Sequence, residues 1–360
     1  MKQFIPYSLI AAVLACGLAS AQTTAYTTPV GYVSITCTRG PAGSDTRVGL
    51  PLRQPTVAAA ALTATPSSNI LTVSTAAFGA YANTHYVKFT SGPADGKIYA
   101  ITANDATTIT INLNGDILTA VNTNTFSVSK YWTLGELFDP ALITGDPLTT
   151  GNAIVGSASA LARKTEVLLP NHVTAGINLA PSSTFYVTPA VGGTWRNANG
   201  DGLNYNAQIL LPDSYFIIRN RSTVTSPTTY VCTGEVDMGN VVIPLNTRAG
   251  GTNQKQDVAV ALTRPVDVTL DGLGLGGTAA FMSSASALAV RDVLYVFSNT
   301  TIGQNKASSA SYFYSGGMWV KSGQTGNWGS DIIPAGSGIV IRKYGTTLGA
   351  TDFWKNTSTY

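Results

Sequence analysis

Short runs of β-branched and aromatic residues alternate with Gly, Asn, Asp and Pro along most of the chain. Runs of this kind are typical of β-strands bounded by turns. Examples from the second half of the chain are Val241–Ile243, Val258–Leu262, Val266–Leu270, Val293–Phe297, Tyr312–Tyr314 and Gly338–Arg342. A helical period is nearly absent, and only Thr133–Phe138 is expected to form a single turn. The pattern predicts an all-β protein of packed sandwiches or barrels.

One stretch of the chain occurs twice. Ser157–Ala162 reads Ser-Ala-Ser-Ala-Leu-Ala, and the same six residues recur at Ser284–Ala289. The match continues without a gap to Tyr186 and Phe313, with more than a third of the positions identical. The later identical pairs are Thr174 with Thr301, Gly176 with Gly303, Asn178 with Asn305, Ala180 with Ala307 and Ser182 with Ser309. We interpret this match as an internal duplication.

The duplication extends in both directions. Further correspondences align Gly193-Thr194-Trp195 with Gly317-Met318-Trp319, Leu210-Leu211-Pro212 with Ile332-Ile333-Pro334, and Ile217-Ile218-Arg219 with Val340-Ile341-Arg342. Upstream, Val48, Leu52 and Pro55 align with Val258, Leu262 and Pro265, at a larger offset. The first copy therefore carries an extra segment between Val57 and Ser157.

The extra segment resembles a module of its own. It contains strand-like runs at short spacing, namely Ile70–Val73, Tyr86–Thr90, Ile98–Thr102, Thr108–Ile111 and Thr125–Ser129. Turn signals such as Ser91-Gly92-Pro93 and Asn114-Gly115 separate them. We expect a meander that forms a small β-barrel; the alternative is a decorated loop without its own core.

These patterns predict an all-β fold with two tandem homologous β-sandwich/barrel-like units and a small β-barrel module inserted in the first. The expected boundaries are a signal peptide over 1–21, a first β repeat over 26–62 and 131–233, the inserted module over 63–130 and a second β repeat over 234–360. Two equivalent units packed together give each an apolar face to bury.

The first residues have the pattern of a secretion signal. Lys2 is followed by the apolar run Phe4–Leu14 and by Ala19-Ser20-Ala21, a small-residue cleavage site before Gln22. We therefore expect a secreted or extracytoplasmic protein. Val13-Leu14-Ala15-Cys16 supports a second reading, a lipoprotein with its lipid on Cys16.

With cleavage after Ala21, two cysteines remain, Cys37 and Cys232. An even count in an oxidising compartment is compatible with a disulfide. Cys37 follows the first strand-like segment, and Cys232 lies in the last one before the second repeat, so the two segments are expected to be neighbours. Two unpaired buried thiols are the alternative reading.

Composition narrows the classes of function. Charged residues make up 11% of the chain, well below the usual share of about 25%. A net charge of +3 over 360 residues provides no basic stripe for nucleic acid. No later segment is long and apolar enough for a membrane span. Hydroxyl and amide residues dominate instead, as in many secreted β-proteins.

Some segments resemble a known group of proteins. They are the paired Trp195 and Trp319, the run Leu-Pro-x-x-Tyr-Phe-Ile-Ile-Arg over Leu211–Arg219 and the ending Phe353-Trp354. The chain resembles an uncharacterised family of secreted bacterial proteins known mainly from verrucomicrobia and their relatives. The resemblance implies a signal peptide and a secreted β-protein, and it brings no assigned activity or catalytic residue.

We expect no catalysis, cofactor or metal site. The sequence contains no nucleophile elbow, no zinc-protease motif and no phosphate loop. Glu136, Glu166 and Glu235 are the only glutamates, and their positions select no acid–base pair.

Two functions remain as hypotheses. The first is a secreted or cell-surface structural or interaction protein, such as a surface-layer, coat, filament or adhesive component, whose partner is itself. The second is a carbohydrate-binding protein whose partner is a surface glycan. Its binding residues would be the repeated aromatics Trp195, Trp319, Tyr205, Tyr312 and Tyr314, because aromatic rings stack on sugars as well as pack in cores. Exposure of Trp195 and Trp319 discriminates between the two hypotheses.

Overall fold

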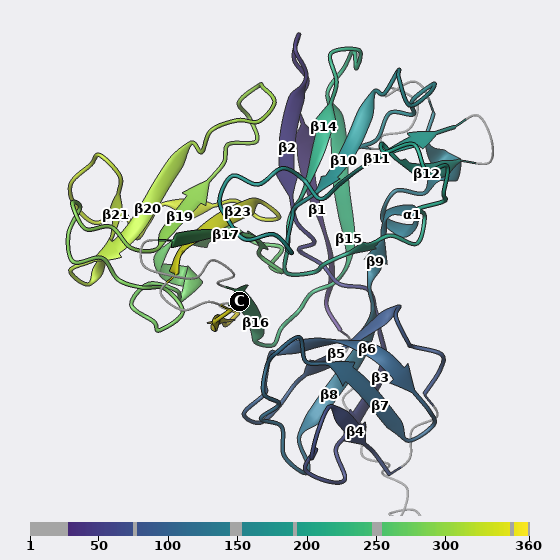
Figure 1. The fold of residues 1–360 in the computed structure, drawn as a ribbon, viewed down its shortest axis with the longest axis vertical. Helices are drawn as coiled ribbons and strands as arrows, with labels where there is room; N and C mark the ends of the chain where they lie inside the picture. The colour runs from purple at the N-terminus through teal and green to yellow at the C-terminus, as the bar shows by residue number, and fades with distance from the viewer. Residues whose placement is uncertain are drawn as a thin grey trace, which may run out of the picture.

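The computed structural model describes residues 28–74, 78–144, 153–189, 193–246, 254–345 and 349–358. The prediction of an all-β protein is confirmed: nearly all regular structure is strand, arranged in several sheets. Figure 1 shows two sandwich-like halves, one formed mainly around β2 and β14 and one around β17 and β23, with a separate module below them. The expected signal peptide, 1–21, with its alternative lipidation site Cys16, lies outside the described residues.

The first half is a five-stranded sheet covered by a two-stranded ribbon. The sheet order is β12-β11-β10-β14-β2, and the ribbon pairs β1 with β15. The bounds are β1 Val30–Cys37, β2 Ser44–Val48, β9 Trp132–Thr133, α1 Leu134–Leu137, η2 Pro140–Leu142, β10 Thr165–Leu169, β11 Ser183–Thr188, β12 Thr194–Asn197, β13 Ile209–Leu210, β14 Phe216–Asn220 and β15 Thr228–Glu235. Sheet, ribbon and the α1 region share one core, in which Val167, Tyr230 and Phe138 meet. The single helical turn expected at Thr133–Phe138 is α1, capped by the Thr133 hydroxyl.

The second half has the same plan. Its sheet runs β21-β20-β19-β23-β17, and its ribbon pairs β16 with β24. The bounds are β16 Val241–Asn246, β17 Gln254–Ala261, β18 Val268–Thr269, η3 Asp271–Leu273, β19 Val293–Val296, β20 Ala310–Ser315, β21 Met318–Lys321, β22 Ile332–Ile333, β23 Gly338–Gly345 and β24 Thr351–Asn356. Leu294, Trp354 and Leu273 join sheet, ribbon and η3 in one core.

Each strand of one half therefore has a counterpart in the other. The short pair β9·β13 corresponds to β18·β22, and both five-stranded sheets have the same order when read from their outer edges. The shared strand order is a property of the fold, whereas the duplication is inferred from the sequence.

The strand pairing changes one expected correspondence. Val48 lies opposite Phe216 in the first sheet, and Val260 lies opposite Ile339 in the second. Because Phe216 and Ile339 are equivalent, Val48 corresponds to Val260 and not to Val258. A slip of two residues keeps every side chain on the same face of a sheet, so the apolar pattern fits both alignments.

The inserted module is a six-stranded antiparallel sheet in the order β3-β8-β5-β6-β7-β4. The bounds are β3 Thr56–Ala61, β4 Ile70–Thr72, β5 His85–Phe89, β6 Ile98–Asn104, β7 Thr108–Asn112 and β8 Thr125–Lys130. It has its own core, which includes Val87, Ile101 and Phe126. The edge strands β3 and β4 form no ladder with each other, so the sheet is not the closed barrel that we expected.

The module begins earlier than the expected residue 63. Strand β3, expected within the first repeat, pairs along its length with β8. Its sequence after Val57 is a run of alanines, which has little intrinsic preference for strands. The strand conformation of β3 is instead stabilised by its pairing with β8 and by the partial burial of its side chains.

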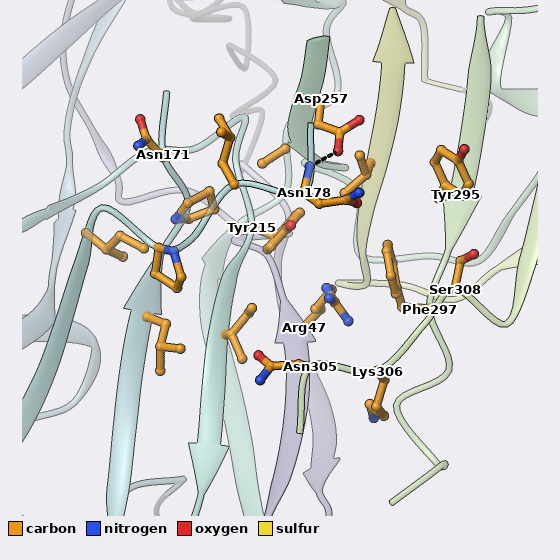
Figure 2. Close-up of a pocket in the computed structure, with 18 of the residues that line it drawn as sticks. Arg47, Asn171, Asn178, Tyr215, Asp257, Tyr295, Phe297, Asn305, Lys306 and Ser308 are labelled. Carbon is orange, nitrogen blue, oxygen red and sulfur yellow. Dashed lines mark hydrogen bonds between the residues drawn. The ribbon is translucent and has the colours of Figure 1, made fainter. Parts of the chain in front are cut away.

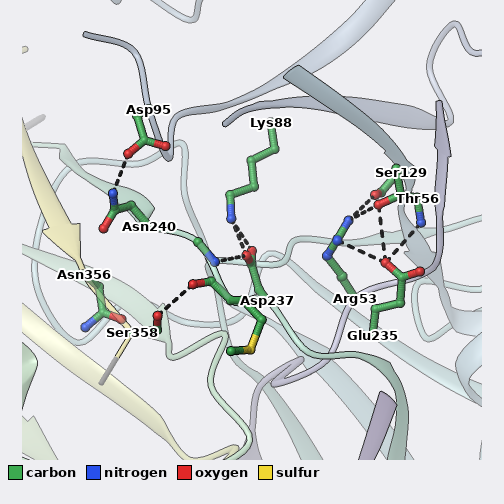
Figure 3. A network of polar contacts seen from close by, with 12 residues as sticks. Arg53, Thr56, Lys88, Asp95, Ser129, Glu235, Asp237, Asn240, Asn356 and Ser358 are labelled. Atoms are coloured by element: carbon green, nitrogen blue, oxygen red, sulfur yellow. Dashed lines mark hydrogen bonds and ion pairs between the residues drawn. The ribbon is translucent and has the colours of Figure 1, made fainter. Parts of the chain in front are cut away.

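Polar contacts hold the module against the segment that joins the two halves (Figure 3). The Lys88 ammonium of β5 lies 2.5 Å from both carboxylate oxygens of Asp237, in a largely buried ion pair. Burial lowers the pKa of Lys88, and the Asp237 charge opposes that shift. Beside it, Arg53 pairs with Glu235 at 3.0 Å and donates to the Ser129 hydroxyl of β8. These contacts fix the module at the junction of the halves.

Within the described residues, no helix is long and apolar enough to cross a bilayer.

The ribbon β1·β15 contains both cysteines. The two strands pair as expected, but Cys37 lies opposite Thr228 while Cys232 lies opposite Val33. At a strand rise of roughly 3.3 Å per residue, the Cα atoms of the two cysteines are separated along the ribbon by about 13 Å, whereas a disulfide needs Cα atoms within about 7 Å. Both thiols are free and buried, so a Cys37–Cys232 disulfide is not formed.

We predict that neither thiol reacts in the native protein. Burial raises the pKa of Cys37 to about 12 and also raises that of Cys232, so little nucleophilic thiolate is present at neutral pH. Iodoacetamide followed by peptide mass spectrometry should detect alkylation of both residues only after denaturation. Recovery of a Cys37–Cys232 cross-linked peptide from an unreduced digest would contradict the prediction.

Candidate functional site

The two repeated tryptophans are core residues. Trp195 on β12 is fully buried and packs against Phe138, and its indole N–H donates to the Phe138 carbonyl at 3.2 Å. Trp319 on β21 is 1% exposed and packs against Phe281 and Tyr314. Neither ring has a face available for a sugar.

The three tyrosines expected at a glycan site are held by their own halves. Tyr205 donates its hydroxyl to Asp201 at 2.5 Å, and the buried Tyr312 donates to Asp331 at 2.5 Å. Tyr314 packs on Trp319 and donates to the Gly317 carbonyl. Of the five rings expected at a glycan site, Trp195, Trp319 and Tyr312 are buried, and Tyr205 and Tyr314 are half-buried and hold contacts within their own halves.

The glutamates are used in local ion pairs. Glu166, with a 1% exposed side chain, lies between Arg163 and Arg221, while Glu235 pairs with Arg53 and Glu136 with Lys130. The part of the chain that the structure describes contains no group of three or more His, Cys, Asp or Glu residues that could hold a metal ion. These carboxylates therefore have structural partners.

The two halves are joined by a pair of reciprocal contacts. Asp45, on β2 of the first half, accepts two hydrogen bonds from Arg219 of the neighbouring strand, at 2.7 and 2.8 Å. Its Oδ2 also accepts from the backbone N–H of Asn305, in the loop 297–309 of the second half, at 2.7 Å. The Asn305 side chain in turn accepts from Arg219 at 2.8 Å. A buried carboxylate thus binds its own sheet and the other half at once.

The equivalent residues make the same contacts in the opposite direction. Asp257 on β17 accepts from Arg342, at 2.6 and 2.9 Å, and from the Asn178 backbone N–H, at 2.7 Å. Asn178 belongs to the loop 170–182 of the first half, and its side chain accepts from Arg342 at 3.0 Å. Each half therefore extends one loop onto the edge strand of the other.

Backbone hydrogen bonds follow the same exchange. Asp45 N–H donates to the Gly303 carbonyl at 2.9 Å, and Asp257 N–H donates to the Gly176 carbonyl at 3.0 Å. Asn178 and Asn305 both have positive φ, 52° and 50°, a conformation that asparagine tolerates better than most residues. The inner sheet edges are thereby covered, which explains why this loop carries so many of the identical residues of the repeat.

Between the halves lies a cavity of about 510 Å³. Its apolar wall includes Tyr215, Tyr295, Phe297 and Val340, which meet where the two sheets approach each other. Figure 2 shows Arg47 near the centre of this region, with Phe297 at its side and Lys306 below it. Sequence reasoning missed Arg47 and Lys306, because their surroundings depend on contacts between halves that only the fold brings together.

The repeated hexapeptide forms two exposed loops. Leu161 and Leu288 are each fully exposed, at 100%. The loop ends are anchored alike: Ser157 N–H donates to the Val187 carbonyl and Ser284 N–H to the Tyr314 carbonyl, both at 2.8 Å. The hydroxyls of these serines accept from Lys164 and Arg291 backbone N–H groups. We call these loops, 157–162 and 284–289, the leucine tips.

Comparison of the chain with known protein families, curated proteins and solved structures finds no significant match.

We predict that Asp45→Asn and Asp257→Asn each destabilise the protein. Asparagine leaves the arginine without its charge partner and weakens the acceptor for the loop amide, and removing one member of a buried pair costs about 3 kcal/mol. The loss should be larger for Asp45, whose side chain is 1% exposed against 15% for Asp257. Urea unfolding of each variant and of the wild-type protein measures the loss in the free energy of unfolding.

Asp105→Asn is the control, because Asp105 accepts hydrogen bonds from the backbone N–H groups of Thr107 and Thr108 in an exposed turn of the module. If Asp105→Asn lowered the free energy of unfolding as much as Asp45→Asn, the contacts between the halves would contribute no more to stability than an exposed turn, which would contradict the prediction.

Proposed function

We propose that this protein is an extracytoplasmic structural protein that associates with further copies of itself through its two leucine tips. The observation that carries the proposal is the full exposure of Leu161 and Leu288 in two identical hexapeptides. A single exposed leucine on a protein surface is ordinary. Both halves keep the same exposed leucine, although most other positions differ between them. We infer that these leucines have a role other than stabilising the fold.

The internal contacts of each half do not require these leucines. The serine anchors hold the ends of each loop, and the leucine side chain projects away from them. Burying one leucine side chain against a partner is worth roughly 2 kcal/mol. Two tips per chain give two such contacts, and their effects add when one partner or assembly engages both.

A second copy of the chain offers a matching surface. A hollow of about 300 Å³ lies where the module meets both halves, and Tyr99, Pro212 and Phe353 are among its apolar lining residues. A tip of one molecule that enters the hollow of the next makes a heterologous contact, which forms rings or open filaments. The inner sheet edges are covered by the loops 170–182 and 297–309, so the proposal relies on the tips and not on edge pairing.

The proposed location outside the cytoplasmic membrane rests on the N-terminal sequence pattern, and the resemblance to secreted verrucomicrobial proteins supports the same location. A surface with few charges and many hydroxyls suits close packing between copies. The proposal includes no catalysis and no cofactor.

We predict that the purified protein forms assemblies larger than a monomer, and that Leu161→Ser with Leu288→Ser shifts them toward the monomer. Serine removes the apolar contact and leaves the anchored loop ends unchanged. Light scattering coupled to size exclusion gives the mass, and negative-stain electron microscopy shows whether the assemblies are regular.

Leu203→Ser is the matched control, since Leu203 is also exposed, at 60%, but is not part of the repeated hexapeptide. It should leave assembly unchanged. A wild-type protein that stays monomeric at its highest soluble concentration would overturn the proposal, as would assemblies that persist in the double variant.

A further inference from the structure

The cavity between the halves has an unbalanced positive charge. Arg219 and Arg342, on its walls, are each paired with an aspartate. Arg47 and Lys306 also line it, and neither makes an ion pair within the described part of the chain. Asp257, already engaged by Arg342, is the one carboxylate among the described lining residues. Arg47 and Lys306 therefore have no ion-pair partner among the described residues, and the Asp45 carboxylate that attracts Lys306 is already engaged by Arg219.

Arg47 is held in place from both sides. Its backbone N–H donates to the Asn299 side chain at 2.9 Å, and the same amide donates back to the Arg47 carbonyl at 2.8 Å. Its guanidinium carbon lies 3.6 Å from the centre of the Phe297 ring. The Nε and Nη1 atoms are buried and have no hydrogen-bond partner among the described residues, while the Arg47 side chain also interacts with that of Tyr215. Burying a charge in this way is costly unless an opposite charge is near.

Lys306 lies on the loop that crosses from the second half. Its ammonium group donates to the carbonyls of Ser298 and Thr301, at 2.9 and 2.7 Å, which are neutral acceptors. Burial and the nearby charge of Arg47 lower the pKa of Lys306, and the charge of Asp45 opposes that shift. An anion in the cavity would relieve the repulsion between these two cations.

The other half shows that the fold does not need either cation. Arg47 lies opposite Ile217, and the residue in the equivalent pairing, opposite Val340, is Ala259. The loop position of Lys306 is occupied by Leu179 in the first half. Both cations therefore break the equivalence of the two halves, and both do so at the same cavity.

We propose that this cavity binds a small organic anion of the class of sugar acids, with its carboxylate beside Arg47 and Lys306. The volume of about 510 Å³ falls within the usual range for small-molecule sites, about 300–1,000 Å³. Asn171 and Asn178 from the first half, and Tyr295 and Ser308 from the second, also line the cavity and offer amide and hydroxyl partners for sugar hydroxyls. This inference is independent of the leucine tips.

Isothermal titration calorimetry tests the proposal, with D-glucuronate as the probe, D-glucose as its neutral analogue and sulfate as an inorganic anion. We expect saturable binding of one glucuronate per chain, no measurable binding of glucose and weaker binding of sulfate. Since a hydrogen bond to a charged group contributes about 1.5–3 kcal/mol, Arg47→Ala and Lys306→Leu should each weaken glucuronate binding about tenfold or more.

Arg47→Ala introduces the residue found at the equivalent position of the second half, Ala259, and Lys306→Leu introduces the one found in the first half, Leu179. Circular dichroism melting verifies that both variants fold. Arg291→Ala is the matched control, because Arg291 lies over the Tyr344 ring, among residues that do not line the cavity. Absence of glucuronate binding to the wild-type protein would overturn the proposal. Equal binding of glucose or sulfate, or affinity unchanged in both cavity variants, would also overturn it.

Discussion

An aspartate on the edge strand that binds an arginine of its own sheet and a loop of the other half is the constraint on which this structure depends. Asp45 and Asp257 each occupy that position, one in each half. Each edge strand would otherwise present unpaired backbone groups, which invite pairing with other chains. The loop from the opposite half satisfies them. The halves thus complete each other, and neither inner edge is open.

The contact between the halves is reciprocal, because each half places one loop on the edge strand of the other. An isologous contact of this kind cannot extend to further copies, so association between molecules has to use other surfaces. The leucine tips lie outside the exchange, and their leucine side chains are fully exposed in both halves. The residues of the same contact line the cavity, where the departure from equivalence at Arg47 and Lys306 concentrates positive charge.

Much of the fold follows from the sequence because strand signals are local. The runs at Val293–Phe297 and Thr125–Ser129 predict strands that form nearly as expected, and burial of Trp195 and Trp319 agrees with the ordinary role of aromatics in a core. Register is harder, because a slip of two residues between Val48 and Val258 preserves the face of every side chain.

The site could not be predicted for a related reason. Asp45 meets Asn305, and Arg47 meets Phe297, only after two distant parts of the chain pack together. The repeat alignment did contain a signal. Identities cluster in the loops 170–182 and 297–309, where Gly and Asn are needed for backbone geometry and contact with the other half, and Lys306 departs there from Leu179. The cysteines show the same limit, since strand adjacency was predictable and their offset within the ribbon was not.

Native-state hydrogen exchange tests the central claim most directly. The backbone N–H groups of Asn178 and Asn305 lie in loops and donate to a carboxylate of the opposite half. If the halves hold each other as described, both amides exchange as slowly as those of the sheet strands, and Asp45→Asn accelerates exchange at Asn305. Exchange of both loop amides at the rate of an unprotected chain, with the sheet amides still protected, would contradict the account.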